Sequence, residues 1–375
     1  MGTVNAAIAR AKRIVVKIGS SLIVGEDGTP RAAWLQSLAA DIARWQGRGC
    51  EVLLVSSGAV ALGRGRLGLS NPLRLEQKQA AAAIGQPLLM GALGDAFAGH
   101  DLSIAQALLS LDDTERRRRW LNARATLETL LDVGILPVVN ENDTVATDEI
   151  RYGDNDRLAA RVAQMLSADL LVLLSDIDGL YTSDPRRDPS AEHLPLISAF
   201  TPTIEAMAGG ANAEDGVGSG GMVTKLAAAK IAHGAGCATL IACGTQTAPL
   251  EALESGGRAT LVQPSMSPET ARLSWLKGHL RPEGEIIIDA GAGRALQEGA
   301  SLLPVGVVDV SGQFDRGSAI AIKSAGGAVL AKGITAYSAA DIRRIAGHRS
   351  EDIPSILGVA RRAAIVHRND LVIDR

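Results

Sequence analysis

Ile14-Val15-Val16-Lys17-Ile18-Gly19-Ser20-Ser21 begins an alternation between short apolar runs and longer stretches rich in alanine and leucine, which continues to about residue 263. Apolar runs of strand length that are bounded by Gly, Ser, Asp or Asn indicate buried strands. We expect such strands at Ile14–Val16, Val52–Val55, Leu136–Val139, Leu170–Leu174 and Thr239–Ala242. Helical spacing marks Ala33–Gln46 and Gln77–Leu93, and helix C-caps are expected at Gly47, Gly49 and Gly234. The alternation predicts an α/β fold with a mostly parallel sheet that helices cover on both faces.

The pattern changes after about residue 264. The segment 265–281 contains proline and charged residues and reads as a connector. Beyond it, short runs with glycines between them occur at Glu285–Asp289, Val305–Val310, Ala319–Lys323 and Val329–Ala331. Short strands at this spacing predict a small β-rich domain. The expected organisation is therefore a domain over 1–264, a linker over 265–281 and a second domain over 282–375.

Composition limits the class of protein. The net charge is −3, and residues 282–375 hold 11 Lys and Arg against 11 Asp and Glu, so the excess of positive charge typical of nucleic-acid binding is missing. The three cysteines are odd in number and form no C-x-x-C pair, which favours a reducing cytoplasm, and the six histidines show no zinc or triad spacing. We expect neither a signal peptide nor an apolar run of roughly 20 residues that would span a membrane.

A phosphate site is indicated by Ser219-Gly220-Gly221-Met222-Val223-Thr224-Lys225, a glycine-rich loop that runs directly into the helical pattern Leu226–His233. Backbone N–H groups, a helix N-terminus and an ammonium group directed at one point suit a chain of phosphates. Lys17, at the end of a strand, would supply a second cation, and Asp176 would orient the lysines or hold a metal ion. Taken singly, Lys17 could be a solvated lysine and Asp176 a turn cap. Together with the loop, they favour phosphoryl transfer.

Two familiar glycine patterns do not carry this inference. A Walker A loop requires a Gly-Lys dipeptide, and the chain contains none. The pattern G-x-G-x-x-G occurs at Gly63–Gly68 and at Gly216–Gly221, and we interpret the first as a loop because it does not directly follow a strand. The run Arg116–Arg119 is expected near the start of a solvated or interface helix rather than at a nucleic-acid site.

Other polar motifs at predicted strand ends suit an amino acid acceptor. Ser57-Gly58 opens a helix after a strand, so its amides could hold a carboxylate or a phosphate, although a simple N-cap is an equal alternative. Asn140–Thr144 and Gly153–Asp156 could bind an ammonium group through Asp and a carboxylate through Asn, or could simply form Asx turns. These motifs contain no His or Cys. Because a carboxylate is already ionised at pH 7 and needs no general base, the acceptor is expected to be a carboxylate.

These motifs resemble the amino acid kinases, and within them the branch that phosphorylates glutamate. The resemblance runs nearly end to end, and Asn140–Asp143 with Gly153–Asp156 is its most specific part. The remaining motifs are Val16–Ser21, Val55–Ala59, Ser175-Asp176, Gly179–Tyr181 and Ser219–Lys225. In the tail, Gly299–Gly306 and the stretch from Arg344 to Gly358 resemble a PUA domain. The resemblance implies a three-layer αβα amino acid kinase fold followed by a PUA pseudo-barrel.

The resemblance also implies roles for particular residues. The implied catalytic residues are Lys17, Lys225 and Asp176. ATP would be held by Lys17, Ser175, Asp176, Ser219, Gly220, Gly221, Met222, Val223, Thr224 and Lys225. Glutamate would be held by Ser57, Gly58, Asn140, Asp143 and Asn155, with Asp154 and Asp156 supporting the substrate loop. Arg151 stands where many relatives have Lys, which changes the donor geometry of that position.

The implied reaction uses ATP and Mg²⁺ to convert the side-chain carboxylate of L-glutamate to L-glutamyl 5-phosphate, the first step toward proline. The resemblance further implies feedback inhibition by proline, a homo-oligomer (dimer or tetramer) and functional coupling to glutamyl phosphate reductase in the cytoplasm. Two alternatives stay open. The acceptor could be aspartate, N-acetylglutamate or UMP, or the tail could bind RNA through Arg343-Arg344 and Arg361-Arg362.

Overall fold

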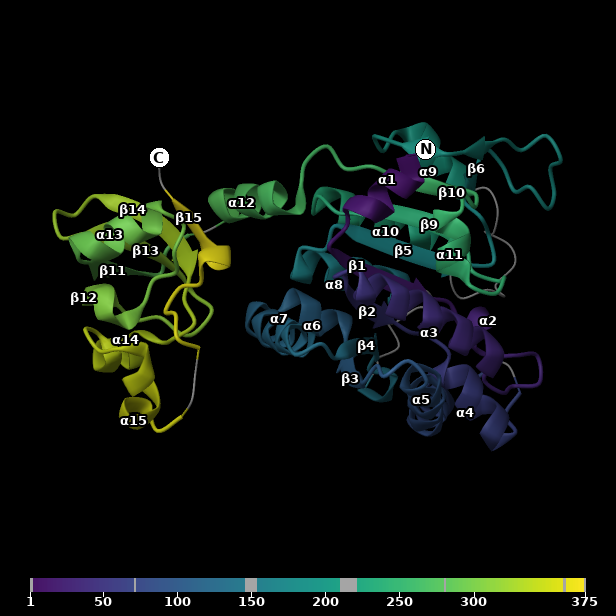
Figure 1. The fold of residues 1–375 in the computed structure, drawn as a ribbon, viewed down its shortest axis with the longest axis horizontal. Coiled ribbons are helices and arrows are strands. Elements are labelled where there is room, and N and C mark those ends of the chain that lie inside the picture. Colours follow the sequence, from purple (N-terminus) through teal and green to yellow (C-terminus); the bar gives the residue numbers. More distant parts are fainter. Residues whose placement is uncertain are drawn as a thin grey trace. The chain divides into compact units, whose positions relative to one another are not determined.

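The computed structural model describes residues 3–70, 72–145, 154–209, 221–279, 281–359 and 362–373. The chain divides into two compact units, Met1–Pro268 and Glu269–Arg375 (Figure 1). The boundary falls within the segment 265–281, which holds helix α12 (Pro268–His279). Each unit is described by itself below.

The first unit is built on an eight-stranded sheet with the order β3-β4-β2-β1-β5-β9-β10-β8. Its strands are β1 (Arg13–Ile18), β2 (Glu51–Val55), β3 (Ile104–Leu109), β4 (Leu136–Glu141), β5 (Leu170–Ser175), β8 (Leu196–Ile197), β9 (Ala238–Cys243) and β10 (Ala259–Val262). Neighbouring strands pair in parallel, except that β9 and β10 are antiparallel. The five predicted strands are confirmed as the five adjacent strands β4, β2, β1, β5 and β9. The mostly parallel sheet is therefore also confirmed.

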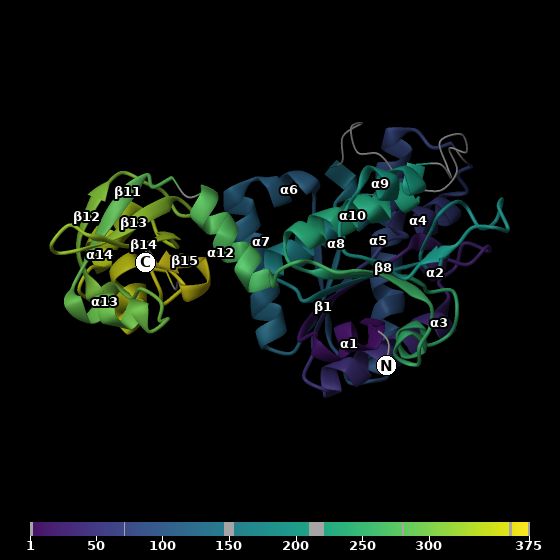
Figure 2. The ribbon, with the colours of Figure 1, turned by 90° about the horizontal axis from the view of Figure 1, so that it is seen from above.

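Helices cover both faces of this sheet (Figures 1 and 2). Ile14, Val16 and Ile18 of β1 point to one face, while Val15 points to the other, as the two-residue period of a strand requires. The first face packs against α1 (Thr3–Arg10), α3 (Ala32–Gly47), α5 (Leu75–Ala98) and α11 (Pro249–Glu254). The second packs against α7 (Arg117–Asp132), α8 (Asp154–Leu166) and α10 (Met222–Gly234). The three-layer architecture expected from the resemblance is confirmed.

The remaining elements of the first unit are short, apart from α4. They are α2 (Ser20–Ile23), α4 (Ala59–Leu67), α6 (Leu111–Glu115), η1 (Asp143–Val145), β6 (Leu180–Tyr181), β7 (His193–Leu194) and α9 (Pro202–Gly209). Helix α7 begins at Arg117, as expected for the arginine run, and its first turn is solvated. The exposed side chains of Arg116 and Arg119 pair with Asp112 at 2.8 and 3.2 Å.

The expectation of a loop at Gly63–Gly68 was wrong, because Gly63 and Gly65 lie inside helix α4, and Gly68 is its left-handed C-cap. Gly63 is needed for a close crossing of α4 and α5. A Cβ atom at Gly63 would lie 1.8 Å from the carbonyl oxygen of Ala81, and one at Gly85 would lie 1.7 Å from that of Ala59. Each glycine therefore accommodates the backbone of the other helix, a packing reason that outweighs the low helix propensity of glycine.

Two of the three expected glycine caps differ from the prediction. Gly49 has a φ of 83° just after α3, as predicted for a left-handed C-cap position. Gly47 and Gly234 instead lie in the last turns of α3 and α10. After α10 the left-handed position is taken by Gly236, with a φ of 76°.

Helix α5 is long and apolar enough to cross a membrane by length and composition, so the expectation that no segment reaches this limit needs one correction. A core helix meets the same criterion, and 39% of the most apolar window of α5 is buried. Leu89, Leu93 and Phe97 pack in one cluster with Leu35 of α3. Length and composition therefore do not distinguish a membrane span from a packed helix here.

The second unit holds a mixed five-stranded sheet with the order β12-β11-β13-β14-β15. Its strands are β11 (Gly284–Ile288), β12 (Val307–Gly312), β13 (Ala319–Ser324), β14 (Val329–Ile334) and β15 (Leu371–Ile373). Its helical elements are α13 (Ala290–Gln297), η2 (Pro304–Gly306), α14 (Ala339–Ile345), η3 (Ser350–Asp352), α15 (Ile353–Leu357) and η4 (Arg368–Asp370). The prediction of a small β-rich tail is confirmed, while the short strand β15 was not predicted.

Candidate functional site

Four neighbouring strands, β4, β2, β1 and β5, carry polar residues at the same edge of the sheet. Asn140 lies in β4, Ser57 follows β2, Lys17 lies near the end of β1, and Ser175 ends β5. Because these strands are parallel, their carboxyl ends meet at one edge, which is where ligands bind in open α/β sheets. Helices α8 and α10 add their first turns to this edge.

Two buried lysines converge on one buried carboxylate. Lys17 Nζ lies 2.6 Å from Asp156 Oδ1, and Lys225 Nζ lies 3.4 Å from Asp156 Oδ2. Thr224 Oγ1 donates to the same Oδ2 at 2.8 Å. The three charged side chains come from β1, α8 and α10, so the fold brings Asp156 together with residues that lie 139 positions before it and 69 positions after it in the sequence.

The electrostatics of this cluster follow from burial and charge. Burial opposes ionisation of Asp156, but the nearby charges of Lys17 and Lys225 outweigh it and hold the pKa of Asp156 below its usual value. Burial lowers the pKa of Lys225, and Asp156 only partly compensates. Asp156 therefore stays ionised and orients both ammonium groups. The sequence left two roles open for Asp176, which were orientation of the lysines and binding of a metal ion. In the structure it is Asp156, not Asp176, that pairs with both lysines and orients them.

The first turn of α10 supplies the backbone part of a phosphate site. Gly221 is its N-cap, and Met222, Val223 and Thr224 form the first turn. N–H groups at the start of a helix lack a preceding turn of carbonyl groups and carry the positive end of the helix dipole. The N–H group of Thr224 is the exception here, because it donates to the Gly221 carbonyl oxygen at 3.1 Å. Met222 packs its side chain into the core, whereas Val223 is 54% exposed. Ser219 and Gly220 of the predicted loop lie outside the described residues.

A chain of side-chain amides lies beside the lysines. Asn155 Nδ2 donates to Ser57 Oγ at 3.0 Å and to Asn140 Oδ1 at 3.2 Å. Asn140 Nδ2 in turn donates to Gln86 Oε1 of α5 at 2.7 Å. Asn155 and Asp156 are consecutive, so the first turn of α8 joins the amide chain to the lysine pair. Gln86 was missed by the sequence analysis, because only the α4–α5 crossing brings α5 to this edge.

The other expected acceptor residues lie around the same edge. Gly58 caps α4 with a φ of 101°, a left-handed conformation that favours glycine. Asp143 lies in η1, next to α5. Asp154 begins α8, but its side chain, like Arg151 and Gly153, lies outside the described residues.

Asp176 lines a second feature, an open cavity of about 380 Å³ after β5 and β9. Its lining includes Asp176, Asp178, Arg186, Cys243, Gln246 and Arg258. Arg186 Nη2 donates to Asp176 Oδ2 at 2.8 Å, and although burial opposes it, this bond holds the pKa of Asp176 below its usual value. Ser175 is buried at the end of β5, beside this cavity. Arg186 and Arg258 lie in loops that gave no sequence signal.

The arrangement suits transfer of a phosphoryl group. Two ammonium groups and the N-terminus of α10 can neutralise phosphate oxygens, and such neutralisation is the main task of a protein in phosphoryl transfer. Among the described residues, no group of three or more His, Cys, Asp or Glu side chains could hold a metal ion.

Comparisons with known proteins agree with both units. A model of the amino acid kinase family matches residues 12–243, and a model of the PUA domain matches residues 284–357. The chain is 57% identical over 368 residues to "Glutamate 5-kinase" of Paramagnetospirillum magneticum, covering 98% of this chain and 99% of that relative. It is 56% identical over 369 residues to "Glutamate 5-kinase" of Caulobacter vibrioides, covering 98% of each. Carbamate kinase from Giardia lamblia bound to AMP-PNP is similar with a TM-score of 0.48 and 16% identity, over 68% of this chain and 100% of that one.

Proposed function

The chain belongs to the amino acid kinase family, and from this premise we propose that it transfers the γ-phosphoryl group of ATP to the side-chain carboxylate of L-glutamate. The product is L-glutamyl 5-phosphate, and the reaction is the first step of proline biosynthesis. One observation carries the proposal: consecutive residues, Asn155 and Asp156, join a cluster of amides suited to an amino acid to a pair of lysines suited to phosphates.

ATP lies across the carboxyl ends of β1 and β5. Lys17, Lys225 and the N-terminus of α10 hold its phosphates, and Ser219 and Gly220, which precede α10 in the sequence, are proposed to bind them as well. Ser175 and Asp176 support the nucleoside, and the cavity of about 380 Å³ next to Asp176 receives it. Mg²⁺ bound with ATP would neutralise phosphate charge, and Asp176, directly after β5, is the carboxylate that would hold it.

Glutamate lies at the ends of β2 and β4. Ser57, Gly58, Asn140 and Asn155 hold its carboxylate and ammonium groups, and Asp143, in η1 and close to this cluster, is the acidic partner of the ammonium group. Asp154, the first residue of α8, supports the substrate loop. The side-chain carboxylate thereby faces the lysine pair.

The reaction needs positioning and charge neutralisation rather than proton transfer. An oxygen of the glutamate side-chain carboxylate attacks the γ-phosphorus, a new P–O bond forms, and the bond to the β-phosphate oxygen breaks to release ADP. Because the carboxylate is already ionised at pH 7, no side chain has to remove a proton. Lys17 and Lys225 stabilise the charge on the transferring oxygens, and Asp156 fixes both lysines.

Formation of a hydroxamate from L-glutamate, ATP, Mg²⁺ and hydroxylamine tests the proposal, because hydroxylamine traps an acyl phosphate. We expect a glutamate-dependent signal that Lys225→Ala abolishes. Lys230→Ala is the matched control, since Lys230 lies on the same helix with a side chain that is 60% exposed. A folded wild-type chain without a glutamate signal would refute the proposal. L-aspartate, N-acetyl-L-glutamate and UMP, assayed beside it, would then identify another acceptor.

The proposed biological setting is a cytoplasmic homo-oligomer, a dimer or tetramer, inhibited by proline at the glutamate site and functionally coupled to glutamyl phosphate reductase. An apolar strip on α5, which includes Ile84 (37% exposed) and Leu88 (43% exposed), is a suitable surface for self-association. Light scattering measures the oligomeric state, and proline added to the hydroxamate assay measures the inhibition.

A further inference from the structure

Gln86 lies at the outer end of the amide chain. Its Oε1 accepts from Asn140 Nδ2 at 2.7 Å, while its Nε2 is buried and has no hydrogen-bond partner among the described residues. At the inner end of the chain, Asn155 Oδ1 is likewise buried and without a hydrogen-bond partner within the part of the chain described. A buried amide group without a partner is costly, so both atoms point to a ligand that supplies one.

The two unpartnered atoms differ in kind. Gln86 Nε2 is a donor and needs an acceptor, whereas Asn155 Oδ1 is an acceptor and needs a donor. A free amino acid carries both complements on its α-carbon, a carboxylate and an ammonium group. An amino acid seated along the chain can therefore satisfy both ends at once.

The order of the chain decides which group meets Gln86. Asn155 is followed by Asp156, which pairs with Lys17 and Lys225, so the side chain of the acceptor leaves the amide chain at its Asn155 end and runs toward the lysines, while the α-ammonium group meets Asn155 Oδ1. Gln86 is separated from Asn155 by Asn140, and it therefore faces the end of the acceptor that is remote from the lysines. Of the groups at that end, only the α-carboxylate is an acceptor.

We propose that Gln86 is a specificity-determining residue of the acceptor site, whose Nε2 donates a hydrogen bond to the α-carboxylate of the bound amino acid. The inference rests on the proposed glutamate kinase function and assigns it one further binding residue. The glycine crossing explains how α5 supplies this side chain, because Gly85 places the backbone of α5 against α4 directly before Gln86.

The test compares L-glutamate with L-isoglutamine, which carries an amide in place of the α-carboxylate. Gln86→Glu keeps an oxygen for Asn140 but replaces the donor by a carboxylate. We expect the KM for glutamate to rise about tenfold or more, the size of one hydrogen bond to a charged group, with little change in kcat or in the KM for ATP. The preference for glutamate over isoglutamine should fall by more than the same factor, because the new carboxylate accepts from the α-amide.

Gln77→Glu is the matched control, since it makes the same change about 13 Å earlier on α5, where Gln77 Oε1 accepts from the backbone of Arg74. Gln86→Met tests the inference without a new charge and should raise the KM for glutamate while removing the preference between the two acceptors. Stabilisation of each variant against heat by glutamate alone gives a second readout that needs no turnover.

The outcomes separate the two proposals. An active wild-type chain whose Gln86 variants keep the glutamate preference, or lose activity equally with both acceptors, would leave Gln86 a structural residue and refute the inference alone. A folded wild-type chain that produces no acyl phosphate from glutamate would refute the proposed function itself.

Discussion

At the scale of single residues, the site depends on charges that are buried together. Lys17, Asp156 and Lys225 are each less than a tenth exposed, so none of them is hydrated as it would be at the surface. A buried charge is tolerated when it is paired, and removal of one partner leaves the others uncompensated. Asp156 is the shared partner, which makes the cluster most sensitive to its loss.

Asp156→Asn should lower the free energy of unfolding at pH 7 by about 3 kcal/mol, because it leaves two buried ammonium groups without their carboxylate. Asp112→Asn makes the same chemical change at an exposed ion pair and should cost less than about 1 kcal/mol. Urea unfolding measures both. If the two variants lost the same unfolding free energy, burial of Asp156 would not explain its contribution to stability.

The effect of Asp156→Asn on the free energy of unfolding should depend on pH. The pKa of Asp156 is lowered in the folded state, so its contribution to stability is present above the unfolded value of about 3.9 and is lost as the pH falls through the folded value. The difference in unfolding free energy between the wild type and Asp156→Asn should therefore shrink below about pH 4. A constant difference down to the acid transition would show that the charge of Asp156 does not cause the effect.

The sequence indicated the two lysines and the acceptor amides, but not how they are connected. Lys17 and the loop before Lys225 carry local signals, namely a cation at a strand end and a glycine-rich helix start. Asp156 was singled out only as part of the acidic motif Gly153–Asp156, and its contact with Lys17 could not be predicted because it depends on the packing of α8 beside β1. Gln86 looks like an ordinary helical residue until α5 is placed against α4. Long-range packing, rather than local chemistry, set the limit of the prediction.

At the scale of elements, the crossing of α4 and α5 depends on the missing side chains of two glycines. Gly63→Ala should destabilise the first unit by about 1–3 kcal/mol or more, because its Cβ would lie 1.8 Å from the Ala81 oxygen and force the helices apart. Gly91→Ala is the matched control, since a Cβ there meets nothing within 4 Å and should stabilise the helix by roughly 0.5–1 kcal/mol. Thermal unfolding shows whether each variant is less or more stable than the wild type. If Gly63→Ala and Gly91→Ala were both more stable, the close crossing of α4 and α5 would be contradicted.

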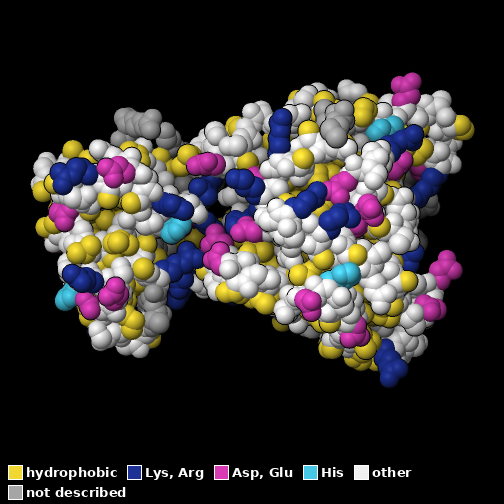
Figure 3. Space-filling view, in the orientation of Figure 1, with side chains coloured by type: hydrophobic (Ala, Val, Ile, Leu, Met, Phe, Trp, Pro, Cys, Tyr) yellow, Lys and Arg dark blue, Asp and Glu magenta, His cyan; other side chains and the backbone are white. Residues whose placement is uncertain are grey.

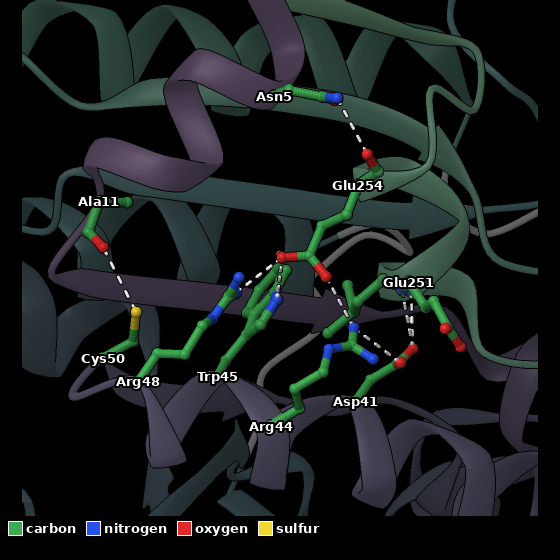
Figure 4. A network of polar contacts seen from close by, with 10 residues as sticks. Asn5, Ala11, Asp41, Arg44, Trp45, Arg48, Cys50, Glu251 and Glu254 are labelled. Atoms are coloured by element: carbon green, nitrogen blue, oxygen red, sulfur yellow. Dashed lines mark hydrogen bonds and ion pairs between the residues drawn. The ribbon is translucent and has the colours of Figure 1, made fainter.

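A polar network fixes α3 to α11 (Figure 4). The Glu254 carboxylate accepts from Arg44 and Arg48 at 2.7 Å each and from Trp45 at 3.0 Å, while the Glu254 carbonyl accepts from Asn5 of α1 at 2.9 Å. Glu254→Ala should therefore lower the unfolding free energy by about 1–2 kcal/mol. Glu251→Ala removes an exposed carboxylate one turn earlier on α11 and should change it by less than about 0.5 kcal/mol. If Glu254→Ala left the unfolding free energy unchanged, apolar packing alone would hold α11 in place.

The strands that the sequence predicted in the first unit share one property, burial on both faces. The residues of β1, β4 and β5 are almost all buried, which produces the continuous apolar runs that were recognised. Strand β3 was missed because it lies at the sheet edge, where only part of its surface is covered and its run includes Gln106. Strand β10 has only four residues and is antiparallel to β9, so its apolar run is too short to be recognised as one more parallel strand. Edge and irregular strands lack the pattern on which the prediction depends.

At the scale of the whole molecule, each unit has its own hydrophobic core. The large clusters of the first unit contain residues from Ile8 to Leu261, and the cluster of the second unit runs from Ile286 to Leu371. On the face shown in Figure 3, basic and acidic side chains are interspersed in both units. Arg343 and Arg344, candidates for RNA contact, donate to the carbonyl oxygens of Gly312 and Ile356. Arg361 lies outside the described residues.

Separate cores predict separate folding, because a unit that buries its own apolar surface does not need the other to be stable. A chain ending at Pro268 contains every residue proposed to bind ATP and glutamate, and we expect it to fold and to form hydroxamate with KM values within about threefold of the full chain. Within the intact chain, Arg343→Ala removes bonds to Val310 and Gly312 and should lower only the unfolding transition of the second unit. A fragment that folds but is inactive would show that catalysis in the first unit requires the second unit. A single unfolding transition of the intact chain that Arg343→Ala shifts as a whole would show that the two units unfold together.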